Sequence, residues 1–203
     1  NTLEMALDAD NIKPKVYKDI IKSAHKNIGL LHDYLDLKKK ANNLEEQHMY
    51  DIYLSSAKYD KKFTYEEAKK IVLESVKPLG ETYYNDYQKA FSEHWLDPFY
   101  RKGKYSGAYS AGTYDTYPYV LMNYKEDFRS VETMAHEMGH SMHSFYSHKN
   151  NLYQNSSYPI FLAEIASNVN EILLFNYMIK NTNNNDEKKF FLETILDSFK
   201  GSI

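Results

Sequence analysis

The 203-residue sequence contains no cysteine. Disulfide bonds, a thiolate nucleophile and a zinc site with cysteine ligands are therefore excluded, and a metal ion would have to be held by histidine and carboxylate side chains. No apolar run approaches the roughly 20 residues that a membrane-spanning helix needs, so no membrane span is predicted. The N-terminal residues lack the basic head and apolar run of a secretion signal, and we expect a cytoplasmic location.

An excess of basic residues is also missing. Residues 1–102 carry 17 basic and 17 acidic side chains, whereas residues 103–203 carry 8 and 11, so the net charge of −3 arises in the second half. Without a basic patch to suit a phosphate backbone, nucleic acid is not expected as a partner. Tyrosine is abundant, with 20 residues. A biased composition explains this abundance more simply than an aromatic binding surface does.

Apolar residues recur mostly at steps of three and four, the spacing of helices with one buried face. Only residues 104–124 have the composition of strands. We therefore predict a mainly α fold with a small antiparallel sheet beside the helix that begins at Asp127 or Ser130. No repeat or interdomain linker is visible, so residues 1–203 are expected to form a single unit. The predicted helices cover residues 16–37, which are expected in the core, and residues 64–76, 83–95, 127–147, 159–180 and 186–200.

His136, Glu137 and His140 form an HExxH pattern on one of these predicted helices. Residues four apart lie on the same helical face, so both imidazoles can reach one metal ion. Glu137 lies about 100° around the helix, where its carboxylate can contact a metal-activated water instead of the metal. The alternative is a pair of surface histidines on an amphipathic helix.

A third ligand is expected from the next helix. Glu164, Ser167, Asn168 and Glu171 form one polar stripe, and the other faces are apolar, so we expect this helix to be enclosed. Two carboxylates that face an interior need a cation or strong donors. Glu164 is therefore the candidate third ligand, and Glu171 suits a hydrogen bond to the N–H of a ligand imidazole. For both glutamates the alternative is a solvated helix face.

Two further predictions concern the surroundings of this site. His143 lies on the same helical face as His136 and could contact the substrate or a ligand, although packing against a neighbouring helix is an equal alternative. The predicted strand at 119–123 could bind an extended peptide through main-chain hydrogen bonds.

The chain resembles the oligoendopeptidase F branch of the thimet oligopeptidase family, whose members are zinc peptidases of the gluzincin type. The resemblance is carried by the segments HEMGHSMHSFYS and YPIFLAEIASNVNE. The segments LEMALDADNIKPKVY, HMYDIY, KPLGETYY and SGAYSAGTYDTYPYVLMNY extend this resemblance over essentially the whole chain. It implies a zinc-dependent metalloendopeptidase that hydrolyses oligopeptides with a metal-activated water. It also implies one Zn²⁺ ion bound by His136, His140 and Glu164, with Glu137 as the general base.

Members of that family are several hundred residues longer and carry, beyond the zinc helices, a segment with His and Tyr that contacts the substrate. We therefore expect the chain to be a catalytic-region fragment that belongs to a larger catalytic domain. The expected partners are oligopeptide substrates, with neither nucleic acid nor membrane, and the sequence leaves the oligomeric state open. An inactive or binding-only helical fragment that retains the metal site is the alternative function. Another gluzincin, such as a carboxypeptidase, would share the same motif.

Overall fold

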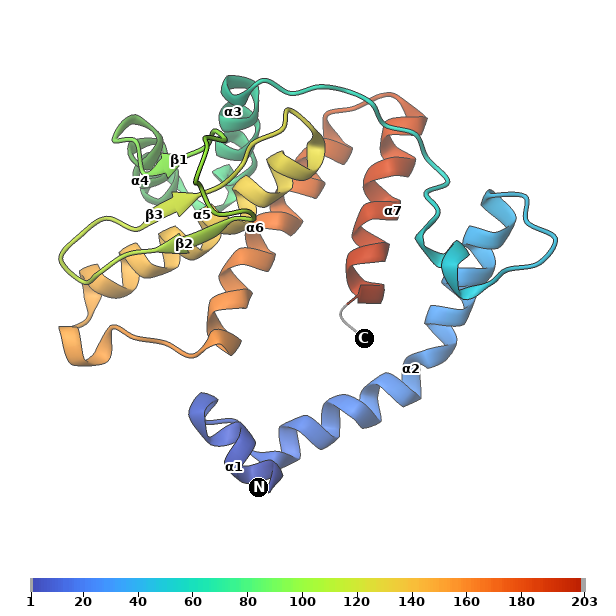
Figure 1. Cartoon of the computed structure of the whole chain (residues 1–203), viewed down its shortest axis with the longest axis horizontal. Helices are drawn as coiled ribbons and strands as arrows, with labels where there is room; N and C mark the ends of the chain where they lie inside the picture. The colour runs from blue at the N-terminus through green and yellow to red at the C-terminus, as the bar shows by residue number, and fades with distance from the viewer. Residues whose placement is uncertain (1, 202–203) are drawn as a thin grey trace. The chain divides into compact units, whose positions relative to one another are not determined.

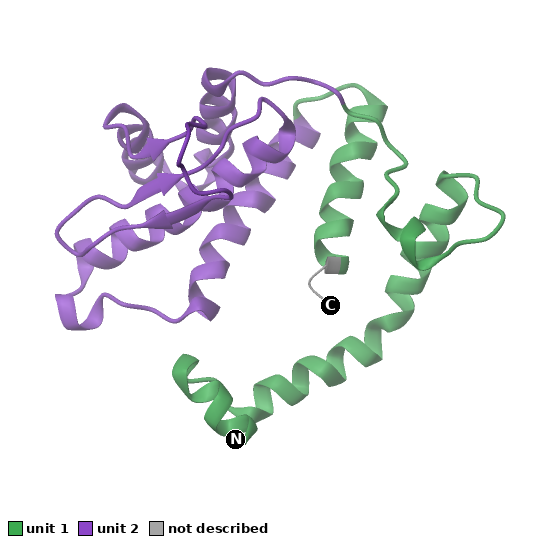
Figure 2. Cartoon of the chain, viewed as in Figure 1, with its two compact units in different colours: residues 1–59, 181–203 green, residues 60–180 purple. Residues whose placement is uncertain are grey.

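The computed structural model describes residues 2–201 and contains two compact units. Unit 1 consists of Asn1–Tyr59 with Asn181–Ile203, and unit 2 consists of Asp60–Lys180 (Figure 2). All predicted site residues belong to unit 2. That the 203 residues act as one part of a larger catalytic domain stays a prediction.

Unit 2 is built mainly from helices, as predicted, with a small sheet beside the helix that carries the HExxH pattern (Figure 1). Helices α5 and α6 pack against each other, and α3 packs on both. The mainly α fold class is thereby confirmed. The elements, in chain order, are α3 (Tyr65–Ser75), η3 (Lys77–Leu79), α4 (Glu81–Ser92), β1 (Leu96–Asp97), β2 (Tyr109–Ala111), β3 (Tyr119–Leu121), α5 (Phe128–Asn150), η4 (Tyr153–Asn155) and α6 (Ile160–Lys180).

The sheet has the strand order β1-β3-β2. Strands β2 and β3 are antiparallel, with Ser110 opposite Val120, and this confirms the antiparallel pair predicted within residues 104–124. The two-residue strand β1 was not predicted; it pairs in parallel with β3, so the sheet is mixed. Because β3 is paired on both sides, the prediction that it binds a peptide along its edge is wrong. The edge strands of this sheet are β1 and β2.

The start and the buried face of α5 follow directly from its sequence. Asp127 caps the helix by accepting a hydrogen bond from the backbone N–H of Ser130 at 2.8 Å. Met134, Met138 and Met142, spaced four apart, are fully buried. These methionines form the packed back of the helix, and the histidines of the motif are consequently directed to another face.

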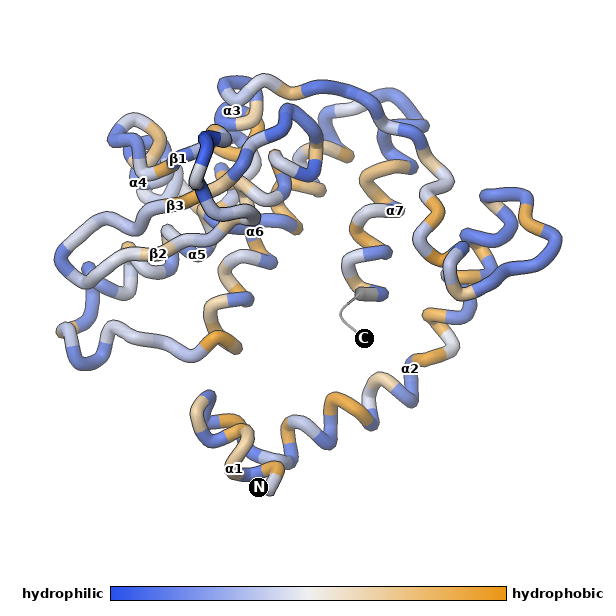
Figure 3. Tube along the Cα trace, in the orientation of Figure 1, coloured by the Kyte–Doolittle hydropathy of each residue, from blue (hydrophilic) through white to orange (hydrophobic). Residues whose placement is uncertain are grey.

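Unit 1 contains α1 (Leu3–Leu7), η1 (Asp8–Asp10), α2 (Pro14–Ala41), η2 (Met49–Tyr53) and α7 (Asn185–Gly201). The helix predicted over 16–37 is confirmed as part of α2, but its place in the core is wrong. Along its apolar stripe (Figure 3), Val16 is 40% exposed and Ile20 is 58% exposed. The buried part of α2 lies near its C-terminal end, where Lys38 forms ion pairs with Glu193 and Asp197 of α7. Among the described residues, no helix combines the length and apolarity that crossing a membrane requires.

Candidate metal centre

Helix α5 places His136 and His140 one turn apart on the same face. Their Nε2 atoms are 3.1 Å apart, and the two rings meet edge to face with centroids 4.7 Å apart. Both imidazoles therefore direct a nitrogen to one point beside the helix.

Helix α6 brings a carboxylate to the same point. Oε2 of Glu164 lies 3.6 Å from Nε2 of His136 and 3.7 Å from Nε2 of His140. The candidate ligand atoms of the three residues all lie within 4.8 Å of one another. Tetrahedral zinc with bonds of about 2.0–2.2 Å separates its ligand atoms by about 3.3 Å. The observed separations are close to this value, so the three side chains fit one such ion.

A close approach of α5 and α6 makes this geometry possible. A Cβ atom on Gly139 would lie 2.7 Å from Cα of Ser167 and 2.8 Å from the carbonyl oxygen of Ala166, so no side chain fits there. Ser167 also donates a hydrogen bond of 2.9 Å to Oε2 of Glu164, which fixes the orientation of that carboxylate. Sequence reasoning missed both contacts, although Gly139 stands inside the motif and Ser167 inside the polar stripe.

Glu171 lies behind the first histidine, where the sequence placed it. Its Oε1 is 2.7 Å from Nδ1 of His136. This hydrogen bond raises the pKa of His136 above the ordinary histidine value of 6.5 and leaves Nε2 directed toward Glu164. The pKa of His140 is lowered instead, because the ring is partly buried and lies beside His136.

A further acidic group belongs to this region and was missed in the sequence. Glu132 precedes His136 by one helical turn, and burial together with the nearby Glu171 carboxylate raises its pKa to about 7. The four-residue spacing to His136 is the only signal that could have identified it.

Glu137 is buried beside the three candidate ligands. Burial raises its pKa above the ordinary glutamate value, and the nearby His136 opposes the rise. The backbone of Ser110 on β2 lies close to the carboxylate and also opposes the rise of its pKa. The cavity next to Glu137 has a volume of about 570 Å³. It is lined by Ala108, Tyr109, Ser110, His136, Glu137, His140, Ser144, Tyr158, Ile160, Ala163 and Glu164.

His143 does not line this cavity. Its ring stacks on Tyr158 with centroids 3.8 Å apart, and burial lowers its pKa. Tyr158 does line the cavity, and its hydroxyl lies 2.5 Å from Oγ of Ser144. The structure therefore places His143 behind Tyr158, and the substrate or ligand contact proposed for it stays a prediction.

The expectation that α6 is enclosed is wrong for the described chain. Phe161 is 51% exposed and Ile165 is 54% exposed, although both lie on faces expected to be buried. The apolar pattern marks these faces correctly, but the described residues do not cover them. Glu164 and Ser167 nevertheless face α5, because the Gly139 contact draws that side of α6 against it.

Comparisons with known proteins agree with the resemblance seen in the sequence. The profile of Peptidase family M3 matches residues 1–202. Oligopeptidase PepF of Bacillus subtilis (strain 168) is 40% identical over 201 residues, which cover 98% of this chain and 30% of that protein. Chromosomal oligoendopeptidase F of Lactococcus lactis subsp. cremoris is 40% identical over 200 residues, or 98% of this chain and 33% of that protein.

A solved structure of a candidate peptidase from Chlamydophila abortus is 40% identical to this chain and superposes with a TM-score of 0.89. The match covers 97% of this chain and 33% of that one. The chain thus spans about a third of the length of the curated relatives it matches.

Proposed function

Since the chain belongs to Peptidase family M3, we propose that it forms the metal-binding part of a zinc-dependent endopeptidase that hydrolyses oligopeptides. The observation that carries this proposal is the convergence of His136, His140 and Glu164, with Glu137 buried beside them. The substrate class is supported by the relatives, which are called oligopeptidase and oligoendopeptidase.

The donor set suits zinc. Two imidazole nitrogens and one carboxylate oxygen are the protein ligands of many hydrolytic zinc sites, which leave a further position open. Zinc in such a site would lower the pKa of a water and polarise a peptide carbonyl. Glu171 would keep the ring of His136 in the orientation that presents Nε2, as carboxylates commonly do for ligand histidines.

Glu137 would act as the general base and acid. Its carboxylate takes the proton of the attacking water and then delivers it to the leaving amine. A pKa raised by burial suits both transfers, because a group that titrates closer to neutrality can accept and release a proton.

Strand β2 would align the peptide. The backbone N–H of Val120 donates to the carbonyl of Trp95 on the β1 side, so Ser110, which is opposite Val120, directs its backbone groups away from β3. Ser110 and Ala108 also line the cavity with the candidate ligands. An extended peptide could therefore pair with this free edge and place one of its carbonyls beside Glu137.

The test is metal analysis and peptide cleavage with the complete natural polypeptide that contains residues 1–203. The wild-type protein should bind zinc stoichiometrically and cleave oligopeptides at internal bonds. Glu137→Gln should bind zinc equally well and lose cleavage by about 10²–10⁴-fold, because an amide cannot accept the proton. Glu81→Gln, an exposed change at the start of α4, is the matched control and should retain full cleavage.

Two results would contradict the proposal. Glu137→Gln that keeps more than about a tenth of wild-type cleavage would show that Glu137 is not the base. Stoichiometric zinc in a wild-type protein that cleaves no peptide would favour the alternative, a helical binding fragment that retains the metal site.

A further inference from the structure

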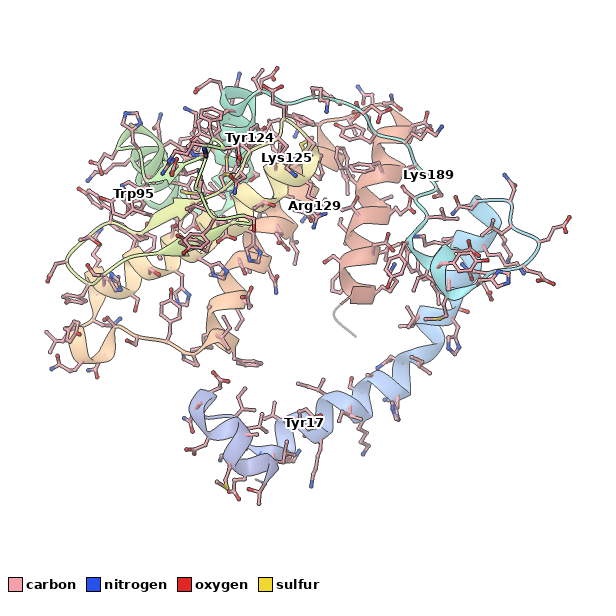
Figure 4. The ribbon with its side chains drawn as sticks, in the orientation of Figure 1. Tyr17, Trp95, Tyr124, Lys125, Arg129 and Lys189 are labelled. Carbon is pink, nitrogen blue, oxygen red and sulfur yellow. The ribbon has the colours of Figure 1, made fainter. Side chains whose placement is uncertain are left out.

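A second cavity, of about 620 Å³, adjoins the metal cavity. Ala108 and Glu137 line both, so the two cavities meet at the proposed base. The second cavity extends toward the N-terminal end of α5, where Lys125 and Arg129 line it. Figure 4 labels both side chains. The rim of this cavity is held in place by Asn123, whose side-chain amide donates to the carbonyl of Gly107 at 3.1 Å. The second cavity is therefore a neighbour of the candidate site, with a rim that the hydrogen bond of Asn123 supports.

Two carboxylates interact with these cations at longer range: Lys125 helps to lower the pKa of Asp127, and Arg129 opposes the rise in the pKa of Glu132. The exposed side chains of Lys125 and Arg129 form no hydrogen bond or ion pair with the described part of the chain. Arg129 lies in the first turn of α5, where the helix dipole disfavours a positive charge. Asp127 lines the same cavity, but its carboxylate accepts the capping hydrogen bond from Ser130. Two cations that form no direct ion pair with the described residues thus line a cavity beside the proposed site of cleavage.

The direction in which a peptide pairs with β2 decides which of its ends meets these cations. Along the cavity walls, Ser110 lies beside Glu137 and the preceding residues Gly107 and Ser106 line the second cavity. A peptide paired antiparallel to β2 therefore extends its C-terminal side from Glu137 into the second cavity. The opposite direction would place the positively charged amino terminus against two cations.

We propose that the second cavity is a subsite for a carboxylate on the C-terminal side of the cleaved bond, bound by Lys125 and Arg129. The inference rests on the proposed peptidase function and specifies its substrates further. Arg129 and Glu137 are eight residues apart on α5, which is about 12 Å along the helix. An extended peptide advances about 3.3 Å per residue, so the carboxylate would lie about three to four residues beyond the cleaved bond. It belongs either to the peptide's own C-terminus or to an Asp or Glu side chain.

The test measures peptide binding by fluorescence anisotropy in the complete natural polypeptide, with Glu137→Gln present to prevent turnover and zinc bound. N-terminally labelled peptides that end in a free acid or in a carboxamide are compared. The free acid should bind about twofold to fivefold more tightly, because an exposed ion pair contributes up to about 1 kcal/mol. Arg129→Gln and Lys125→Gln should each reduce this preference, and Lys70→Gln, an exposed change on α3, should not.

A second pair of peptides separates the two sources of the carboxylate. Both peptides are amidated, and they carry either Glu or Gln three residues beyond the cleaved bond. A preference for Glu that Arg129→Gln abolishes would support the side-chain source. Cleavage by the wild-type enzyme at a fixed distance from the C-terminus would support the terminal source.

The outcomes also separate the subsite from the peptidase function. If wild-type protein cleaves peptides but shows no preference in either pair, or if the preference survives both charge removals, the subsite is refuted and the peptidase remains. If no peptide is bound or cleaved at all, the subsite and the proposed function are refuted together.

Discussion

Replacing Gly139 with alanine tests how the candidate ligands are brought together. The new Cβ would lie 2.7 Å from Cα of Ser167, which is about 0.7 Å short of the 3.4 Å at which ordinary contact begins. The obstructing atoms are backbone, so helix α6 itself has to move. Ser167 precedes Glu171 by one turn and follows Glu164 by nearly one turn, so the displacement reaches both acidic residues.

The expected result is a weaker metal site in a protein that still folds. Overpacking costs about 1–3 kcal/mol, and the higher helix propensity of alanine offsets about 1 kcal/mol of this. A metal site tolerates errors of only about 0.2 Å in ligand distance, whereas α6 has to shift by several times that amount. Zinc affinity should therefore fall by about tenfold or more, measured by competition with a chelator while circular dichroism monitors helix content.

Gly29→Ala is the matched control. Gly29 lies within α2 and has no atom within 4 Å of the position its Cβ would occupy. The same substitution should there stabilise the helix by about 0.5–1 kcal/mol and leave zinc affinity unchanged. If Gly139→Ala keeps zinc affinity within twofold of wild type, with helix content intact, the contact with Ser167 does not set the position of Glu164.

Two further substitutions test the supports of α5. Glu171→Gln should lower the pKa of His136 in metal-free protein, measured by NMR titration, and weaken zinc binding by about 10–100-fold; an unchanged pKa would refute the hydrogen bond. In metal-free protein the His136–Glu171 pair should stabilise the fold fully below pH 6.5 and lose this effect as the pH rises through the raised pKa of His136. Asp127→Ala should destabilise the first turn of α5 by about 1 kcal/mol, and Asp127→Asn by much less, as hydrogen exchange of the Ser130 amide will report. Equal exchange in both variants would contradict a capping role.

Much of the fold was predictable because it depends on local pattern. The apolar spacing gave the helices, and the strand composition of residues 104–124 gave the antiparallel pair β2–β3. Strand β1 was not predictable, since two residues carry no periodicity and its pairing with β3 is decided by tertiary contacts. Without β1, β3 looks like an edge strand, which is why a peptide-binding edge is expected there from the sequence.

The candidate site divides in the same way. His136, Glu137 and His140 are related by the geometry of a single helix, so sequence spacing alone places them. Glu164 lies on another helix, and the polar stripe of that helix predicts only the face on which its side chain lies. The distance between the two helices is known only from the structure. That distance depends on Gly139, which lets the backbone of α6 approach closely. The sequence alone does not predict this contact, because it does not identify the neighbours of Gly139.

The limits of periodicity are clearest where equal patterns have different outcomes. The Met134 series on α5 is fully buried, whereas the apolar stripe of α2 and the face of α6 around Ile165 are exposed in the described chain. Periodicity predicts which residues share a face of a helix. Which other segment covers that face depends on tertiary contacts, which periodicity does not predict. The orientation of the polar stripe of α6 is better determined, because its glutamates contact one particular residue, His136. Glu164 and Glu171 each meet a nitrogen of His136, and that pairing orients α6 independently of what covers its apolar faces.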